Sequence, residues 1–343
     1  MASVSVKPLS LRAGLGALSI LTLLALLMSL FWGRYDLPFT QGVSLLWQWS
    51  INAPLTSEQQ TQLTVLLDIR FPRLLAAVLI GAALAVSGAA FQGLFMNPLV
   101  SPGVLGVLSG AAFGAAVGLL LGVDWLWVQI ASFVGALVSL MLALWLGQDR
   151  QDAGMVRLVL AGMIVGSLFT ALLSVIKYIA DPYDKLPAIV YWLMGSLSMI
   201  DGATLWVMAP MMLLGIGMMI AYGRVLNVMS MGEDEAKTLG IPVKQTRLLI
   251  LVLAAVLGAL TVTLAGMIGW VGLVIPHLVR LVIGADNRWL LPYSAVAGGL
   301  YLLLMDDISR LLLTSEIPLG ILTALVGLPV FAWLLHRGRR VWS

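Results

Sequence analysis

Three ionisable residues near the end of an apolar stretch are the first candidates for chemistry: Asp306, Asp307 and Arg310. A carrier driven by protons or sodium usually needs such groups at mid-membrane depth. These three lie near the outer end of the apolar segment 289–309. The spacing of Asp306 and Arg310 places them one helical turn apart, so a local ion pair is the ordinary interpretation. Ion-coupled transport stays open as an alternative.

Residue types for other kinds of chemistry are scarce in this sequence. The chain has no cysteine and only two histidines, His277 and His336, so thiolate sites are excluded and a histidine metal cluster is not expected. It also lacks the Gly-x-x-x-x-Gly-Lys-Ser/Thr pattern that cradles ATP phosphates. No catalytic constellation stands out. We therefore predict a protein that is not an enzyme, with no metal and no cofactor, whose energy comes from a partner.

One polar segment in the second half of the chain offers a place for that partner to act. The stretch 224–247 carries charges and is flanked by the uncharged runs 202–223 and 248–279. Within it, residues 232–240 predict a short helix, because acids fill its first turn and Gly240 followed by Pro242 ends it. The whole stretch predicts a compact polar knob outside the membrane.

Long apolar runs must hold these groups in place. The sequence is 61% hydrophobic and 10% charged, with a mean hydropathy of +1.03, which is typical of an all-α polytopic membrane protein. Uncharged runs and their Gly and Pro interruptions predict about ten transmembrane helices. Their approximate positions are 13–33, two within 74–123, 125–148, 158–176, 202–223, 248–266, 267–283, 289–309 and 317–336. The apolar piece 186–200 is too short to cross and predicts a re-entrant helix.

Charge distribution predicts the orientation. With both termini in the cytoplasm, the cytoplasmic segments hold thirteen Lys and Arg residues and the outer segments six, in agreement with the positive-inside rule. The same bias accounts for the net charge of +3, so nucleic acid is not expected as a partner. The first apolar run has no small-residue cleavage site, and we expect it to be a retained helix. Residues 1–343 thus form one transmembrane domain, with no separate soluble domain.

Several motifs, in matching order from about residue 13 to 337, resemble the FecCD-type permeases. These are the membrane subunits of ABC importers for iron chelates, haem and cobalamin. The motifs are Ile69-Arg-Phe-Pro-Arg-Leu-Leu75, Gln92-Gly-Leu-Phe-Met-Asn-Pro-Leu99, Pro102-Gly-Val-Leu-Gly106, Gly232-Glu-Asp-Glu-Ala-Lys-Thr-Leu-Gly240, Ala265-Gly-Met-Ile-Gly-Trp-Val-Gly-Leu-Val-Ile-Pro-His277, Asp306-Asp-Ile-Ser-Arg310 and Glu316-Ile-Pro-Leu-Gly320. Each is weak alone, and together they are highly specific.

The resemblance implies partners and roles. It implies a homodimer in the bacterial inner membrane, with two cytoplasmic ATPase subunits below and a periplasmic or lipid-anchored binding protein above. It places Arg70, Arg73 and Arg310 at the binding-protein docking face and Gln148, Asp149 and Arg150 at an inner gate. The path is bordered by roughly 155–176, 186–197 and 318–335. The coupling residues that it implies are Gly232, Glu233, Asp234, Glu235, Ala236, Lys237, Leu239 and Gly240.

Three departures from the family pattern, Ser101, Trp270 and Asp307, leave the substrate open. A ferric siderophore is the first expectation, followed by haem, cobalamin and molybdate. The competing functional hypotheses are an ion-coupled secondary transporter and a structural subunit that transports nothing.

Overall fold

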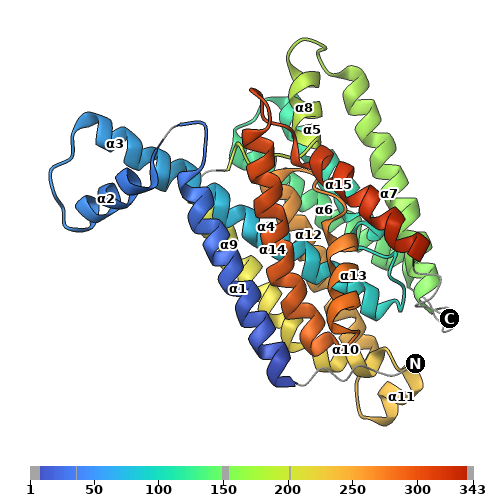
Figure 1. Ribbon diagram of the computed structural model, residues 1–343. Helices are drawn as coiled ribbons and strands as arrows, with labels where there is room; N and C mark the ends of the chain where they lie inside the picture. Colours follow the sequence, from blue (N-terminus) through green and yellow to red (C-terminus); the bar gives the residue numbers. More distant parts are fainter. Residues whose placement is uncertain (1–7, 36, 149–153, 201, 338–343) are drawn as a thin grey trace.

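The computed structural model describes residues 8–35, 37–148, 154–200 and 202–337. All regular elements in these ranges are helices (Figure 1). They are α1 (Pro8–Phe31), α2 (Phe39–Ser50), α3 (Ser57–Thr64), a π-helical turn (Val65–Arg70), α4 (Phe71–Leu94), a 3-10 turn (Pro102–Leu105), α5 (Val107–Leu121), α6 (Trp125–Gly147), α7 (Gly154–Ile179), α8 (Lys185–Leu193), α9 (Gly202–Ala221), α10 (Gly223–Met229), α11 (Glu233–Thr238), α12 (Val243–Ala265), α13 (Val271–Ile283), α14 (Asn287–Leu311) and α15 (Leu319–Arg337).

The predicted set of membrane helices is present. Seven helical stretches in the described ranges are long and apolar enough to cross a membrane, and three shorter apolar helices, α5, α13 and α15, complete ten. The breaks fall where glycine and proline predicted them. The run 74–123 divides between Leu94, the last residue of α4, and the turn Pro102–Leu105. Gly106 ends that turn with φ +76°. The run 248–279 divides at Gly266, which has φ +68°. We call the end that carries α8 the outer end and the end that carries α11 the inner end.

Helix α4 lies in the middle of the bundle and is buried along almost its whole length (Figure 1). Glycines let its backbone touch those of its neighbours. A Cβ on Gly81 would lie 2.1 Å from the Gly298 carbonyl oxygen of α14, and one on Gly88 would lie 1.8 Å from the Gly272 carbonyl oxygen of α13. Side chains are excluded from both crossings, so α4, α13 and α14 pack backbone against backbone.

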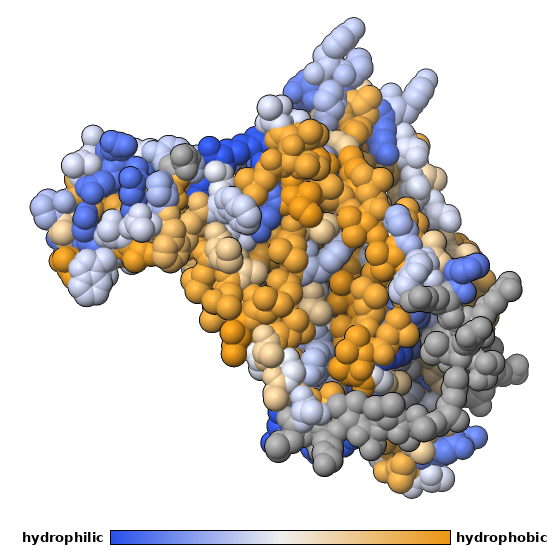
Figure 2. Space-filling model, viewed as in Figure 1, coloured by the Kyte–Doolittle hydropathy of each residue, from blue (hydrophilic) through white to orange (hydrophobic). Residues whose placement is uncertain are grey.

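The outer helices present their apolar faces to the membrane. A hydrophobic band crosses the face seen in Figure 2, and hydrophilic side chains gather on α2–α3 and toward the ends of the molecule. Exposed apolar side chains line α1 over more than two turns: Ile20, Leu21, Leu23, Leu24, Leu27 and Met28. Such a surface is stable only in lipid or against another protein.

The segment between α1 and α4 forms two short helices that extend sideways from the bundle (Figure 1). A capping box starts α3, because the Thr56 hydroxyl accepts from the Gln59 amide and the Gln59 side chain accepts from the Thr56 amide. Helix α2 exposes Phe39, Trp47 and Trp49. Tryptophan rings favour the membrane–water interface, so α2 is suited to lie at the membrane surface.

Candidate functional site

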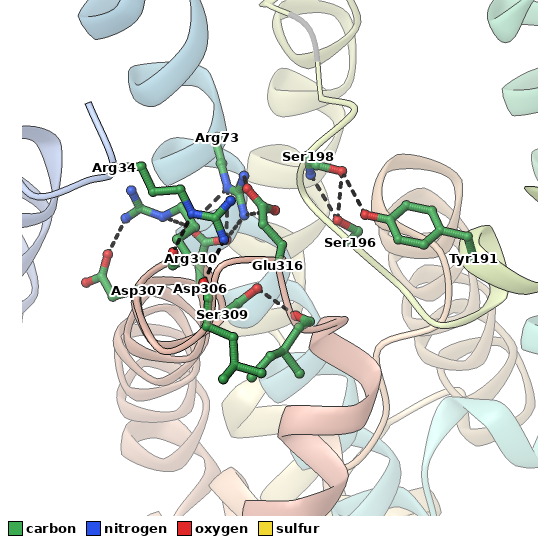
Figure 3. A network of polar contacts seen from close by, with 12 residues as sticks. Arg34, Arg73, Tyr191, Ser196, Ser198, Asp306, Asp307, Ser309, Arg310 and Glu316 are labelled. Carbon is green, nitrogen blue, oxygen red and sulfur yellow. Dashed lines mark hydrogen bonds and ion pairs between the residues drawn. The ribbon is translucent and has the colours of Figure 1, made fainter.

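A network of ion pairs at the outer end brings Arg73 and Arg310 together on one acid (Figure 3). Arg73 of α4 donates from Nε to Asp306 Oδ1 at 2.9 Å, and Arg310 donates from Nε to Asp306 Oδ2 at 2.9 Å. Asp306 is fully buried. The predicted ion pair between Asp306 and Arg310 is therefore present, and a second arginine from a distant helix completes it.

Glu316, in the loop before α15, forms the upper part of the same network. Arg73 donates from its two terminal nitrogens to the two oxygens of Glu316, both at 2.9 Å. This fork geometry is the strongest form of arginine–carboxylate contact. Burial by itself would raise the pKa of Glu316, but the hydrogen bonds from Arg73 and the positive charges of Arg73, Arg34 and Arg310 together outweigh burial, so the pKa of this carboxyl lies below its ordinary value.

Asp307 and Arg34 extend the network toward α1. Asp307 pairs with Arg310 and accepts from the Ser29 hydroxyl of α1. Arg34 donates from Nε to the Arg310 carbonyl at 3.0 Å and from a terminal nitrogen to the Leu313 carbonyl at 3.0 Å. The network thus ties the outer ends of α1, α4 and α14 to the loop that leads into α15.

Arg70 also lies at the outer end, where it binds backbone carbonyls. Its guanidinium donates to the Leu30 and Tyr35 carbonyls, at 3.1 Å and 2.6 Å, and so closes the chain after α1 against the π-helical turn. Both of these acceptors are backbone carbonyls, so Arg70 differs from Arg73 and Arg310, which pair with carboxylates.

The three arginines of the docking hypothesis, Arg70, Arg73 and Arg310, lie together at one end of the bundle. Their exposed fractions are only 6%, 8% and 7%. Each guanidinium donates to carboxylates or carbonyls of its own chain. Whether the three arginines also contact a binding protein stays a prediction.

Three helix ends meet beside this network and hold the short helix α8 in place. The Leu319 amide donates to the Gly195 carbonyl at 2.9 Å, the Gly320 amide to the Met194 carbonyl at 3.0 Å and the Ser196 amide to the Ala265 carbonyl at 2.9 Å. These bonds join the segment after α8 to the start of α15 and the end of α12. The predicted re-entrant piece 186–200 is thus a nine-residue helix, Lys185–Leu193, followed by an irregular segment of turns, packed against protein.

Glycines allow the backbones to approach closely at this junction. A Cβ on Gly320 would lie 2.5 Å from the Met194 carbonyl oxygen, and one on Gly266 would lie 2.2 Å from the Trp192 carbonyl oxygen. Both contacts are with backbone, which cannot move aside without disturbing the junction. Tyr191, Ser196 and Ser198 lie next to it and form a small chain of hydroxyls (Figure 3).

At the inner end, α10 and α11 form the polar knob that the sequence predicted. Helix α11 covers Glu233–Thr238, Gly232 precedes it with φ +131°, and Gly240 follows with φ +80°. Ala236 is fully buried and anchors the helix, while Glu233 pairs with Arg247 at the start of α12. Leu239 remains 63% exposed. Leu239 is thus an exposed apolar side chain on an otherwise polar segment.

The predicted inner gate is only partly described by the structure. Gln148 is exposed and caps the end of α6, whereas Asp149 and Arg150 lie outside the described residues.

The sequence reasoning missed Glu316 as the partner of Arg73 and missed Arg34 and Ser29 altogether. Glu316 stands 243 positions from Arg73, so no local spacing connects them. The one available signal was its place in the polar loop before α15.

Comparison with known proteins places these features in a family context. The FecCD transport family profile matches residues 21–337. The molybdate import system permease protein MolB of Haemophilus influenzae is 38% identical over 94% of this chain and 95% of its own length. The hemin transport system permease protein HmuU of Yersinia pestis is 38% identical over 96% of both chains.

A vitamin B12 permease and a solved structure agree with this. The vitamin B12 import system permease protein BtuC of Citrobacter koseri is 37% identical over 95% of this chain and 94% of its own length. A solved structure of a metal-chelate type ABC transporter in an inward-facing conformation is 36% identical. It has a TM-score of 0.84 and covers 95% of this chain and 99% of its own.

Proposed function

The chain belongs to the FecCD transport family of ABC transporter permeases, and from this premise we propose that two copies of it form the path for uptake of a metal chelate or related anion. The observation that carries the proposal is the match over nearly the whole chain. It includes the re-entrant segment, the polar knob and the outer arginine network, and relatives of the same length are importer permeases.

ATP hydrolysis belongs to a separate subunit in this proposal, because the chain has no phosphate-binding loop. The contact falls on α10 and α11, with residues 232–240 in a cleft of each of two ATPase subunits. Exposed Leu239 and Met231 supply apolar contact, and the acidic first turn of α11 supplies charge. This orientation leaves the inner end and both chain termini in the cytoplasm.

A binding protein would deliver the substrate to the outer end. Arg73 and Glu316 lie closest to such a partner, since Glu316 keeps 24% of its side chain exposed. A carboxylate on the binding protein would then compete with Glu316 for the fork of Arg73. Arg70 and Arg310 are buried, so they would contribute to docking indirectly, by fixing the positions of the segments that form the docking surface.

The substrate class follows from the relatives. Their names include molybdate, hemin and vitamin B12 as cargo. A ferric siderophore, the first expectation from the sequence, has no support beyond the resemblance. We therefore propose a bulky metal chelate or an oxyanion of this range, with the final choice made by the binding protein.

Reconstitution tests the proposal. The purified chain is placed in proteoliposomes with the ATPase and binding protein encoded beside it, and uptake of ferric siderophore, haem, cobalamin and molybdate is measured. We expect ATP-dependent uptake of one of them. Uptake by the chain alone in a proton or sodium gradient would instead support the ion-coupled transporter, and no accumulation in either assay would support a structural subunit.

A further inference from the structure

Three arginines from distant parts of the chain surround one pocket at the inner end. The pocket encloses about 540 Å³ between the start of α1, the junction of α9 with α10 and the start of α14. Its lining residues are Arg12, Ile220, Ala221, Arg224, Arg288 and Trp289. None of them belongs to the outer network or to the coupling residues 232–240, although Arg224 lies in α10 at the base of the polar knob.

The charges in the pocket are not balanced by the protein. Arg288 pairs with Asp286 at 2.5 Å. Arg12 and Arg224 have neither an ion pair nor a hydrogen bond from their side chains within the part of the chain that the structure describes. A hydrogen bond from Arg288 holds the pKa of Asp286 at about 2, so this carboxylate is ionised at neutral pH. Because Asp286 pairs with Arg288, the positive charges of Arg12 and Arg224 are left without a carboxylate partner in the described residues.

The backbone beneath the arginines is fixed. Asn227 of α10 donates from Nδ2 to Asp286 Oδ1 at 2.6 Å, and its own side-chain oxygen accepts from the Asn287 amide at 2.8 Å. On the other side of the pocket, the Tyr293 hydroxyl of α14 donates to the Leu11 carbonyl of α1 at 2.7 Å. These contacts fix the relative positions of the helix ends that carry Arg224, Arg288 and Arg12.

The surroundings identify the membrane as the source of a ligand. The pocket lies where three membrane-spanning helices end, and Ile220 and Trp289 give it an apolar side. Tryptophan is enriched at the membrane interface, where its ring lies at headgroup level. Basic pockets between transmembrane helices on the cytoplasmic side bind anionic headgroups. Guanidinium groups also match phosphate oxygens in a bidentate way.

We propose that this pocket binds the phosphate headgroup of an anionic phospholipid, with Arg12 and Arg224 as its direct ligands and an acyl chain beside Ile220 and Trp289. The assignment to the inner leaflet rests on the orientation given under the proposed function. Because Arg224 belongs to α10, the bound lipid would lie next to the segment that contacts the ATPase.

Lipid binding by the purified full-length chain tests this without ATP or substrate, so failure of the transport proposal would not affect the result. Phosphatidylglycerol, cardiolipin and phosphatidylcholine are titrated into detergent-solubilised protein, and retained lipid is counted by native mass spectrometry. We expect the two anionic lipids to bind more tightly than phosphatidylcholine. Each arginine replaced, in Arg12→Gln and Arg224→Gln, should lower that affinity roughly fivefold, and the pair roughly 25-fold.

Lys244→Gln is the matched control, because it removes one exposed positive charge at the same end and should leave lipid binding unchanged. Equal affinity for anionic and neutral lipid, or the same loss in the control as in the arginine variants, would overturn the proposal. Displacement of the lipid by millimolar inorganic phosphate would assign the pocket to a soluble anion. Loss of ATPase co-purification in the double variant with normal lipid retention would assign it to an acidic segment of that partner.

Discussion

Asp306 accepts hydrogen bonds from two arginines in a fully buried position, and this single carboxylate holds the outer ends of α4 and α14 together. The Arg73 and Arg310 charges would be expensive to bury without it, because a buried ion that loses its partner keeps its desolvation cost. Asp306 is therefore structural in this chain. Both of its carboxylate oxygens accept from arginines, which leaves neither of them available to a coupling ion.

We expect Asp306→Asn to destabilise the membrane domain by about 3–5 kcal/mol, because it leaves two buried guanidinium groups with less compensating charge. Unfolding in mixed detergent micelles, followed by tryptophan fluorescence, measures the change. Glu58→Gln, at an exposed position in α3, should stay within about 0.5 kcal/mol of the parent. A variant at Asp306 that is as stable as the control would show that the network contributes little.

Glu316→Gln tests whether Arg73 contacts the binding protein in addition to its structural role. Removing this charge frees the fork of Arg73 for an incoming carboxylate, so the affinity for the binding protein should rise and become more sensitive to salt. Surface plasmon resonance at low and high ionic strength gives both values. If the affinity and its salt dependence are unchanged, Arg73 does not take part in docking.

The effect of pH on that contact follows from the lowered pKa of Glu316. A carboxyl whose pKa is below its ordinary 4.5 in the folded chain contributes stability above that pH and loses it as the pH falls through the lowered value. Docking should therefore be the same at pH 7 and pH 5.5 as far as Glu316 is concerned. A change in binding-protein affinity between those two pH values, absent in Glu316→Gln, would contradict the assigned direction.

At the scale of elements, helix α11 owes its shape to local sequence, and the sequence predicted it well. Its glycines, its acidic first turn and its short length are all local signals. The same holds for the break at Gly266. By contrast, the forked contact of Arg73 with Glu316 and the burial of Arg70 depend on which helix ends meet in space. No spacing along the chain encodes that, so the sequence predicted neither of them.

Leu239→Asp should abolish co-purification of the ATPase while leaving the membrane domain folded, because the side chain is 63% exposed and a charge at this position stays in solvent. Affinity pull-down with the tagged ATPase measures the loss. Leu121→Asp, at an equally exposed leucine on the outer end of α5, is the matched control and should keep the partner. Retention of the ATPase by Leu239→Asp would remove the assignment of α11 as the coupling element.

Single cysteines test the path of the chain around α8, because the native sequence has none. Cysteines at Leu186 and Ser198 should both react with an impermeant thiol reagent from the outside and not from the inside, since α8 and the turns that follow it stay at the outer end. Tyr183, at 93% exposure, provides the positive control. Labelling of Leu186 and Ser198 from opposite sides would mean that 186–200 crosses the membrane.

At the scale of the whole molecule, the apolar surface of the bundle has to be shared between lipid and a second copy of the chain. Helix α7 exposes apolar residues along its length, among them Leu160, Ile164 and Leu168, and α15 exposes Leu325 and Leu328. The sequence resemblance places these two helices at the path. The purified complex should therefore contain twice the 36.7 kDa chain mass, in native mass spectrometry, with two ATPase subunits. A single copy would contradict the proposed path.

Helix α14 connects the two ends of the molecule in one rigid piece. Its first residues are clamped to α10 through Asn227, and its last turns carry Asp306 and Arg310. Twenty-five residues make a rod roughly 37 Å long. If the clamp at the inner end were the pivot, a tilt of about 3° would carry the Arg310 end sideways by roughly 2 Å, which is more than enough to break a hydrogen bond. A small tilt of α14 at its contact with α10 would therefore be amplified into a displacement at the other end, where Asp306 holds Arg73.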